Sequence, residues 1–409
     1  MRRVVVTGMG VVCPVGNDLP TSWHNLINGT CGIDYITKFD TTDYKVKIAA
    51  EVKGFDPTLY IDKSDVKKTD LYAQYAIAAA TQAMEDSGLK DIDPQRLGVY
   101  IGSGVGGMNA FINEQTKLLE KGPSRVSPFF IPMMISNMAS GLVAIKYNAQ
   151  GPCLPVVTAC STSAHAVGEA FRAIKHGYAD AIIAGGAEAT ITTLAIAGFT
   201  NIMALTTNND PLNSSIPFDK RRNGFVMGEG AGIMIVEEYE HALKRGANIY
   251  AEISGYGNTC DAHHITAPHP EAEGAKNAID LAIKEANLDL SGQLYINAHG
   301  TSTPLNDKAE TLAIKKALGD KAYDAVISST KSMTGHMLGA AGAVEGIISI
   351  MALNNGIIPP TIGYKEKDED CDLDYCPNKA RECAVDASLC MLLGFGGHNA
   401  CLAFTKVAR

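Results

Sequence analysis

The sequence predicts an α/β fold built from two halves with one topology. Short apolar runs alternate with amphipathic stretches along the chain, which is the pattern of strands alternating with helices. A length of 409 residues with 46% hydrophobic content is enough for two or three average domains or for one large duplicated unit. A helix, strand and glycine turn at residues 76–104 recurs at residues 278–300, which indicates an internal duplication with a junction near residue 250.

The first strand is predicted at Arg3–Gly8, because an apolar run ends there in a glycine turn. This run superficially resembles a signal peptide, but Thr7, Gly8, Gly10 and Pro14 interrupt it too early. The remaining first-half strands are predicted at Gly98–Gly102, Val156–Ala159, Ala181–Ala184 and Gly232–Glu237. Those of the second half are Ile249–Gly255, Leu294–Asn297, Ala325–Ser329 and Ala400–Phe404. The predicted helices are Thr69–Ser87, Ser161–His176, Gly274–Ala286, Lys308–Leu318 and Gly339–Leu353.

Composition excludes several classes of protein. No run approaches the roughly eighteen consecutive apolar residues of a membrane helix, so no membrane association is expected. A net charge of −9 argues against nucleic acid as a partner. The ten cysteines are scattered on a long chain without an export signal, which indicates reduced thiols in a cytoplasm. The segment Cys371–Cys390 has no Cys-x-x-Cys pair and no matching histidine spacing, so no metal is expected there.

Cys160 is the candidate nucleophile. It stands between Val156-Val157, interpreted as the end of a buried strand, and a helix predicted from Ser161 onward. The N-terminus of a helix offers unpaired N–H groups and a positive dipole end, which together lower the pKa of a thiol. The alternative is a buried structural cysteine, which behaves as a small hydrophobe and is common. The other motifs of the chain favour the catalytic interpretation.

Polar residues of the second half gather in three glycine-bounded clusters, each beside an apolar run. The clusters span residues 297–304, 328–336 and 394–399. Strand-end loops are where α/β folds collect their ligands. His299 and His336 stand beside glycine at predicted strand exits with hydroxyl-rich neighbours, so with a thiolate they form a candidate catalytic set. A surface or hydrogen-bonded structural role is the more common one for His165, His176 and His398.

Together these motifs resemble those of the condensing enzymes, in particular the β-ketoacyl-acyl-carrier-protein synthases. The resemblance covers essentially all 409 residues and is closest to the elongating synthases of dissociated, type II fatty-acid synthesis. The matching segments are Thr158–Ser163, Pro217–Asp219, Gly224–Gly230, Asn297–Pro304, Lys331–His336 and Gly394–Gly397. The resemblance implies a thiolase-like, duplicated five-layer α/β/α/β/α fold, usually in a homodimer. Residues 1–250 would carry the nucleophile, and residues 251–409 the histidines and a gating loop.

The resemblance also implies a ping-pong decarboxylative Claisen condensation. Cys160 would take an acyl group from an acyl-carrier protein, after which a malonyl-carrier thioester would lose carbon dioxide and its enolate would attack the acyl-cysteine. His299 and His336 would donate N–H groups to the enolate oxygen. The main-chain N–H groups of Cys160 and Phe395 would serve the tetrahedral intermediates. Lys331 would orient His299 and tune the electrostatics of the site.

Further roles follow from the family pattern. Phe395 would be a gate for the acyl chain, because glycines on both sides allow the backbone to move. The supporting network would contain Glu310 and Asp307. The substrate-binding residues would be Val105, Phe130 and Phe199 in the acyl tunnel, with Thr266, Thr301 and Thr303 near the pantetheine arm. The candidate basic patch for an acidic carrier protein comprises Lys63, Lys67, Lys68 and Arg125.

This chain departs from the family at two places. It has Met391-Leu392-Leu393 where related synthases commonly carry Asn-Ser-Phe beside a monovalent-cation site. Met203 replaces a basic residue that relatives use for the carrier protein, so carrier recognition is expected to be shifted or weaker. Neither a cofactor nor a metal is expected, since the substrates themselves carry phosphopantetheine on the carrier protein.

Four other functions compete with fatty-acid elongation. A ketosynthase of a dissociated polyketide pathway would share every catalytic residue. A non-catalytic chain-length partner lacks the nucleophile, so Cys160 argues against it. A thiolase would use a second cysteine near the C-terminus, where this chain has Gly394-Phe395-Gly396-Gly397. A Cys-His hydrolase fits the residue inventory, but nothing in the sequence positions an activated water.

Overall fold

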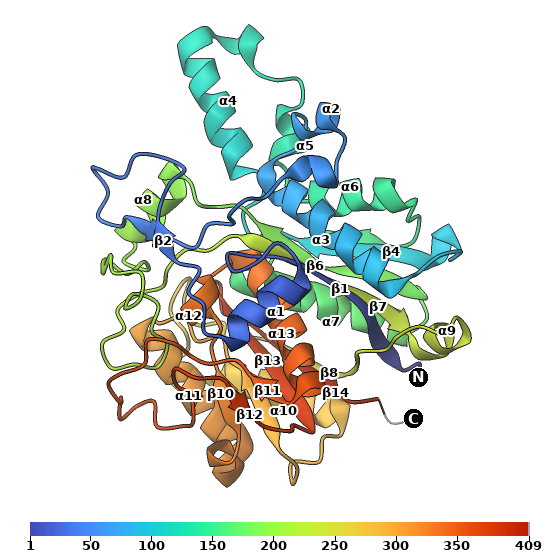
Figure 1. The fold of residues 1–409 in the computed structure, drawn as a ribbon, viewed down its shortest axis with the longest axis vertical. Coiled ribbons are helices and arrows are strands. Elements are labelled where there is room, and N and C mark those ends of the chain that lie inside the picture. Colours follow the sequence, from blue (N-terminus) through green and yellow to red (C-terminus); the bar gives the residue numbers. More distant parts are fainter. Residues whose placement is uncertain (408–409) are drawn as a thin grey trace.

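The computed structural model describes residues 1–407, and a ten-stranded mixed sheet runs through it (Figure 1). The first half contributes the strands β1 (Val4–Val12), β4 (Leu97–Gly102), β5 (Cys153–Leu154), β6 (Ala181–Glu188) and β7 (Gly230–Glu238). The second half contributes β8 (Ala251–Cys260), β9 (Leu294–Asn297), β10 (Val326–Ser328), β13 (Ala387–Gly394) and β14 (His398–Thr405). Two small two-stranded sheets pair β2 (Asp34–Tyr35) with β3 (Ile48–Ala49), and β11 (Ile357–Ile358) with β12 (Arg381–Glu382).

The helices surround and separate the two halves of the sheet. Those of the first half are α1 (Leu19–Ile27), α2 (Lys63–Val66), α3 (Leu71–Ser87), α4 (Met108–Lys121), α5 (Phe130–Met134), α6 (Met138–Tyr147), α7 (Thr162–Lys175), α8 (Thr193–Asn201) and α9 (Tyr239–Lys244). Those of the second half are α10 (Glu273–Ala286), α11 (Pro304–Leu318), α12 (Lys331–Thr334) and α13 (Ala341–Asn355).

The strand order confirms the predicted duplication. From the middle of the sheet outward, the first half runs β1, β7, β6, β4, β5, and the second half runs β8, β14, β13, β9, β10. In each half the first two pairings are antiparallel and the next two are parallel. Within residues 1–407 the strands of the ten-stranded sheet join the two halves through β1 and β8, at Val5 with Glu252 and Val6 with Ala251. Each half is therefore a five-stranded unit with the same chain path.

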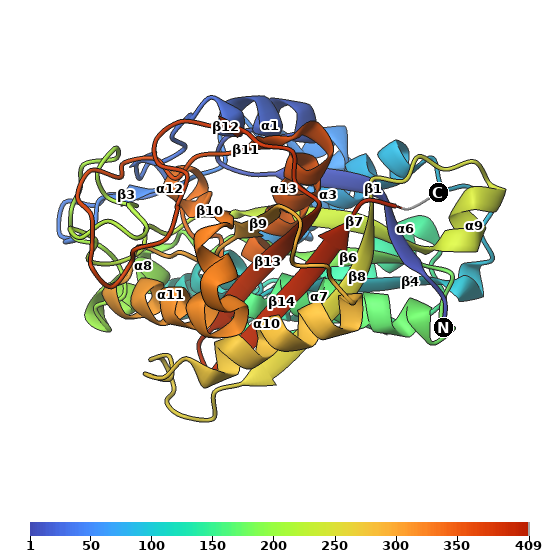
Figure 2. The ribbon, with the colours of Figure 1, turned by 90° about the horizontal axis from the view of Figure 1, so that it is seen from below.

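The layers follow the same symmetry. Helices α3 and α6 cover the outer face of the first half-sheet, and α10 and α11 cover the outer face of the second. Helices α7 and α13 pack against each other between the two half-sheets. In Figure 2, α13 and α10 lie on opposite sides of β13 and β14. The predicted α/β/α/β/α arrangement is thus confirmed. The segment Leu338–Asn355 has the length and composition of a membrane span, with a hydropathy of 1.2, but 83% of it is buried, as expected of this central layer.

The two halves use the same packing device between their first strand and first long helix. A Cβ added to Gly10 of β1 would lie 2.0 Å from the carbonyl oxygen of Ala79 on α3. A Cβ added to Gly257 of β8 would lie 1.8 Å from the carbonyl oxygen of Ala278 on α10. The same contact repeats one turn along each helix, at Gly8 with Ala83 and at Gly255 with Ala282. Glycine on the strand and alanine on the helix let the two backbones touch.

The prediction of a strand at Val156–Ala159 is wrong. The strand in this region is β5, and Val157 is 49% exposed. The chain crosses the end of β4 here, so close that a Cβ on Gly102 would lie 2.1 Å from the carbonyl oxygen of Val156. A segment that crosses a strand end does not pair with it. Strand β13 and helices α1, α4, α6 and α8 were also outside the predicted elements.

We expect Gly10→Ala and Gly257→Ala each to lower the free energy of unfolding by about 1–3 kcal/mol, because overpacking forces backbones apart. Urea titration followed by circular dichroism measures this loss. Gly198→Ala is the matched control, since its Cβ would meet nothing within 4 Å on α8. That substitution should stabilise by about 0.5–1 kcal/mol. Equal stability of all three variants would contradict the packing argument.

Candidate active site

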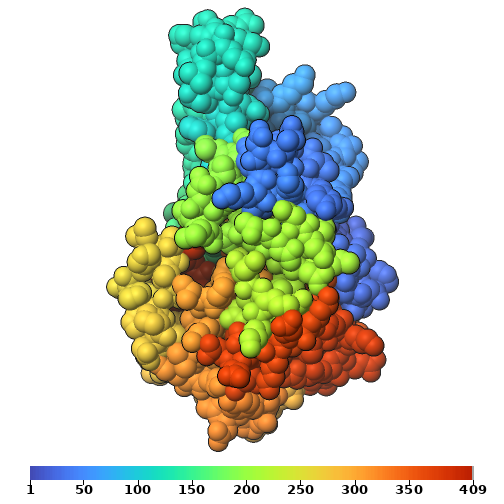
Figure 3. All heavy atoms as spheres, turned by 90° about the vertical axis from the view of Figure 1, so that its left-hand side faces the viewer, coloured from blue at the N-terminus to red at the C-terminus, as the bar shows by residue number. Residues whose placement is uncertain are grey.

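One cavity of about 400 Å³ gathers most of the predicted catalytic and substrate-binding residues, which come from both halves of the chain. Its lining includes Cys160, Phe199, Thr266, His299, Thr301, Thr303, His336 and Phe395. In Figure 3 its mouth is the hollow between the yellow segment around residue 265, the green segment around residue 205 and the orange segment around residue 305. The sequence prediction that the thiol and the two histidines share one site is consistent with this geometry.

Cys160 lies in a single 3₁₀ turn, Ala159–Ser161, directly before α7. Ala159 has a φ of 51°, in the left-handed region of the backbone. Residues other than glycine rarely adopt this conformation, and those that do often lie at functional sites. The turn is held from both sides. The Thr158 amide donates to the Thr162 hydroxyl at 2.9 Å, and the Ser161 hydroxyl donates to the His398 carbonyl at 2.9 Å.

The environment of the thiol differs from the predicted one. Burial raises the pKa of Cys160 to about 12, although the positive charge of Lys331 and the main-chain N–H groups of Phe395 and Cys160 act in the opposite direction. The expectation of a thiol with a lowered pKa is therefore wrong, because desolvation in this cavity outweighs the stabilising groups. Cys160 rests as a thiol, and the two N–H groups converge on its sulfur.

His299 and His336 are direct neighbours in the lining of the cavity. Their ring centroids are 5.2 Å apart, and the rings are nearly perpendicular at 87°. Burial lowers the pKa of both imidazoles well below 6.5, and the charge of Lys331 lowers them further. Both rings are therefore neutral at pH 7 and each keeps one N–H donor. Within residues 1–407 the Nδ1 atoms are enclosed without a hydrogen-bond partner, and the Nε2 atoms make no hydrogen bond to the protein.

The two histidines reach the cavity from different kinds of element. His299 follows β9, as predicted. His336 follows the short helix α12 rather than a strand, so its predicted strand exit is wrong. Its position is set instead by a bridge to Met227, in which the His336 amide donates to the Val226 carbonyl at 2.7 Å. The first half of the chain thus holds a histidine that the second half supplies.

Lys331 lies beneath the cavity and forms an ion pair that the sequence did not reveal. Its side chain is 1% exposed, and its Nζ donates to Glu345 Oε1 at 2.5 Å. Burial raises the pKa of Glu345 to about 7, against the opposing effect of Lys331. The signal for Glu345 was its place as the lone charge within the apolar helix at 339–353. A buried charge almost always has a partner.

Glu310 and Asp307 support the loop that carries His299. Glu310 accepts hydrogen bonds from the amides of His299, at 2.6 Å, and Gly300, at 2.7 Å. Its own pKa is raised to about 8 by burial, with Asp307 adding to the effect. Asp307 accepts from the Phe218 amide at 2.8 Å and faces Arg222 at 3.5 Å. Neither carboxyl lines the cavity, so each acts through the backbone it holds.

A second buried carboxyl, Glu188, was missed by the sequence analysis. It ends β6 with no exposed surface and accepts hydrogen bonds from five donors. These are the Ser103 hydroxyl, the Thr190 hydroxyl and the amides of Gly104, Val105 and Gly339. It thereby ties the loop after β4 to the start of the central helix α13. An acidic residue at the end of an apolar run carries no distinguishing sequence signal.

Phe395 lies in the tight turn between β13 and β14. Gly396 and Gly397 follow it with φ values of 85° and 79°, which glycine adopts without strain. The turn is close to the nucleophile, because a Cβ on Gly394 would lie 2.8 Å from the Thr158 carbonyl oxygen. The half-buried Phe395 ring is 6.4 Å from the ring of Phe199. The predicted gate and the nucleophile turn are therefore neighbours.

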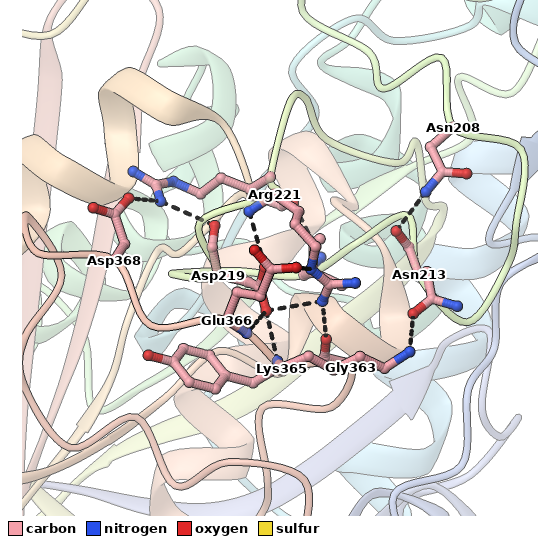
Figure 4. Close-up of polar contacts among 12 residues, drawn as sticks. Asn208, Asn213, Asp219, Arg221, Gly363, Lys365, Glu366 and Asp368 are labelled. Carbon is pink, nitrogen blue, oxygen red and sulfur yellow. Dashed lines mark hydrogen bonds and ion pairs between the residues drawn. The ribbon is translucent and has the colours of Figure 1, made fainter.

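Asp219 of the Pro217–Asp219 motif is the centre of a polar network (Figure 4). Asp219 accepts hydrogen bonds from Arg221 and from the amides of Lys365 and Glu366. These donors overcome burial and lower the pKa of Asp219 to about 2. Arg222 pairs with Asp368 and donates to the Pro304 carbonyl. This network anchors the segment after α8 against residues 363–368 and the start of α11.

Two predicted tunnel residues lie outside the cavity. Val105 follows β4 in the loop held by Glu188 and is 38% exposed, and Phe130 begins α5; neither lines the cavity. Helix α4, which lies between these two residues in the sequence, projects from the body of the protein (Figure 1). Of the predicted basic patch, Lys63, Lys67 and Lys68 lie exposed on or after α2, and Arg125 is exposed in the turn after α4.

Lys331→Met should raise the pKa of Cys160 further, because it removes the charge that opposes burial. Alkylation by iodoacetamide should then be slower by about tenfold for each unit of pKa. The rate is measured between pH 7 and 10. The double variant Lys331→Met/Glu345→Gln should show the same shift without an unpaired buried carboxylate. Lys315→Met, which breaks a surface pair with Asp372, is the control. If the Lys331 variants showed the same dependence of alkylation rate on pH as the wild-type protein, the charge of Lys331 would not act on the thiol.

Comparisons with known proteins agree with this site. The family description "Beta-ketoacyl synthase, N-terminal domain" matches residues 1–242, and "Beta-ketoacyl synthase, C-terminal domain" matches residues 250–365. The chain is 51% identical to 3-oxoacyl-acyl-carrier-protein synthase 2 of Synechocystis sp. over 408 residues, covering 99% of this chain and 98% of the relative. It is 51% identical to the protein of that name from Coxiella burnetii over 409 residues, covering 99% of both chains.

Solved structures share the fold over the full length. A β-ketoacyl synthase from Burkholderia phymatum superposes with a TM-score of 0.92 at 33% identity, covering 100% of both chains. The ishigamide ketosynthase/chain length factor superposes with a TM-score of 0.93 at 35% identity, again covering 100% of both chains. The family regions, the full-length relatives and the shared fold together show that the chain belongs to the β-ketoacyl synthase family.

Proposed function

We propose that this chain is a β-ketoacyl-acyl-carrier-protein synthase that elongates fatty-acyl chains by decarboxylative Claisen condensation with a malonyl thioester. The observation that carries the proposal is the meeting of one thiol and two neutral imidazoles on a single cavity above a buried cation. A neutral imidazole keeps one N–H group, which donates a hydrogen bond to a developing oxyanion. The full-length relatives named 3-oxoacyl-acyl-carrier-protein synthase 2 support the same reaction.

In the first half-reaction the Cys160 sulfur attacks the carbonyl carbon of the acyl thioester. The N–H groups of Cys160 and Phe395 face the sulfur and serve as donors to the tetrahedral oxyanion. The bond to the pantetheine sulfur breaks, and that sulfur leaves with the proton of the Cys160 thiol. A protonated Cys160 suits this sequence of steps, because a thiol undergoes fewer side reactions than a thiolate before the substrate binds. Phe395 moves with its glycine turn to admit the acyl chain.

In the second half-reaction a malonyl thioester occupies the same cavity. Its carboxylate leaves as carbon dioxide, and the electron pair of the broken bond forms an enolate whose oxygen accepts from His299 and His336. The enolate carbon then attacks the acyl carbon on Cys160, and the cysteine sulfur leaves as a thiolate. The buried charge of Lys331 stabilises both anions in this buried site. Thr301 and Thr303, whose hydroxyls are 2.9 Å apart, offer partners to the pantetheine amides.

The polyketide alternative shares this chemistry. A structural neighbour at 34% identity is a ketosynthase of a type II polyketide system in complex with its acyl-carrier protein, with a TM-score of 0.90. The identity of 51% to the relatives named 3-oxoacyl-acyl-carrier-protein synthase 2 favours fatty-acid elongation. The neighbour's complex supports an acyl-carrier protein as the partner in either case. The reaction itself needs no cofactor beyond the pantetheine of its substrates.

We further propose a homodimer in the cytoplasm. Strand β5 is an edge of the sheet, and its outer side has no strand beside it within residues 1–407. Exposed apolar side chains surround that edge, with Leu154 51%, Val157 49% and Ile145 76% exposed. An apolar edge strand is a template for pairing with a second chain. The ten free cysteines support a reducing compartment.

Acylation of Cys160 tests the proposed reaction. Incubation with acyl-carrier thioesters should add one acyl mass at Cys160, and malonyl-carrier protein should discharge it as a β-ketoacyl product two carbons longer. Mass spectrometry follows both steps. Cys160→Ala should abolish acyl transfer. Cys160→Gln should abolish it and keep malonyl decarboxylation, because the amide mimics the acylated state. Condensation by either variant would refute the assignment.

Leu154→Asp should dissociate the proposed dimer, because it places a charge in an apolar edge contact. Size-exclusion chromatography with light scattering reports the mass directly. Leu281→Asp, a change at a comparably exposed position on α10, should leave the mass unchanged. A monomeric wild-type protein would refute the proposed dimer.

A further inference from the structure

The two main-chain N–H groups that converge on the Cys160 sulfur come from different halves of the chain. One belongs to Cys160 itself, in the turn Ala159–Ser161, and the other to Phe395, between β13 and β14. A pair of donors stabilises an oxyanion only when both lie about 3 Å from the place that the oxygen will take. The spacing of these donors therefore depends on the contacts that hold the two turns against each other.

Ser161 makes the first contact between the turns. Its side chain is fully buried, and its hydroxyl donates to the carbonyl of His398, the first residue of β14, at 2.9 Å. A Cβ added to Gly394, at the end of β13, would lie 3.1 Å from the Ser161 Oγ. The hydroxyl thus lies against both strands of the hairpin that carries Phe395.

His165 makes the second contact, about one turn further along α7. Its Nδ1 lies 2.7 Å from the Thr158 hydroxyl oxygen, and its Nε2 lies 3.3 Å from the Asn399 carbonyl oxygen. A carbonyl oxygen can only accept, so Nε2 carries the proton and Nδ1 accepts from the Thr158 hydroxyl. Burial lowers the pKa of the imidazole to about 4, so this neutral form is present at pH 7.

Both hydrogen bonds cross from the first half of the chain to the second. The donors are Ser161 and His165, which follow Cys160, and the acceptors are the carbonyls of the first two residues of β14. The hairpin turn is itself closed by the Gly397 amide, which donates to the Gly394 carbonyl at 3.0 Å. A shift between α7 and the start of β14 would therefore move one N–H donor relative to the other.

We propose that Ser161 and His165 are positioning residues for the oxyanion hole formed by the N–H groups of Cys160 and Phe395. This inference rests on the proposed function. The two side chains hold the start of β14, so Phe395 returns to one position after it has moved to admit the acyl chain.

The two half-reactions depend on this alignment to different degrees. The tetrahedral intermediate of acyl transfer to Cys160 uses the two main-chain donors. Decarboxylation of the malonyl thioester instead places its negative charge beside His299 and His336. Loss of either hydrogen bond to β14 should therefore slow acyl transfer much more than decarboxylation.

The test measures the two reactions separately in Ser161→Ala and His165→Leu. Acyl transfer from an acyl-carrier thioester is followed in a single turnover by mass spectrometry, and malonyl decarboxylation is followed after the same changes are added to Cys160→Gln. Acyl transfer should slow by about a hundredfold, the usual cost of misplacing reacting groups by about 1 Å, and decarboxylation should fall far less. His165→Gln, whose amide can still donate to Asn399, should recover most of the lost rate. His176→Leu, at the exposed end of α7, is the control and should leave both rates unchanged.

Equal losses of both reactions would show that Ser161 and His165 only stabilise the site as a whole, which overturns the inference. Unchanged acyl transfer in Ser161→Ala and His165→Leu overturns it as well. If His165→Leu does not fold, Ser161→Ala decides the matter, because it removes a single hydroxyl. Wild-type protein that takes up no acyl group refutes the proposed function, and the inference with it.

Discussion

The ion pair between Lys331 and Glu345 is the interaction on which the site depends. Both side chains are 1% exposed, and moving two charges out of water costs several kcal/mol per ion unless each neutralises the other. Once paired, the lysine supplies the positive charge nearest the reacting groups. Burial keeps His299 and His336 neutral, and the charge of Lys331 adds to that effect, whereas at Cys160 the same charge opposes the effect of burial. One cation therefore acts on three groups, none of which it touches through a hydrogen bond in residues 1–407.

The buried site in which this cation acts is formed by the duplicated fold. Helices α7 and α13 pack between the half-sheets, and their small residues let them approach closely, as at Gly342, where a Cβ would lie 2.6 Å from the Ala164 amide. Cys160 precedes α7, and Glu345 lies on α13. The central layer thus brings the nucleophile of one half to the cation of the other. In such a low-dielectric layer a single charge acts over a longer range than it would at the surface.

Site residues that can be recognised by their residue type could be predicted from the sequence. Residues whose role depends on their position in the fold could not. Cys160, His299 and His336 stood in polar, glycine-bounded segments, and the structure brings them to one cavity. Glu188 and Glu345 were missed because a carboxylate in an apolar run looks like a chance exception until its donors are known. The segment at 156–159 had the composition of a strand, but it crosses the end of β4 instead of pairing with it. Whether a segment pairs with a neighbouring strand depends on the tertiary structure and cannot be predicted from the local composition.

The junction between the half-sheets has a consequence for how such a protein can change over evolution. Within residues 1–407 the strands of the two halves pair at two residue pairs, yet the thiol comes from one half and both imidazoles from the other. Neither half therefore holds the complete set of thiol and imidazole groups. The chemistry belongs to neither unit and exists only where they meet. A substitution in either half can therefore alter a site to which the other half also contributes, so selection acts on the two halves together.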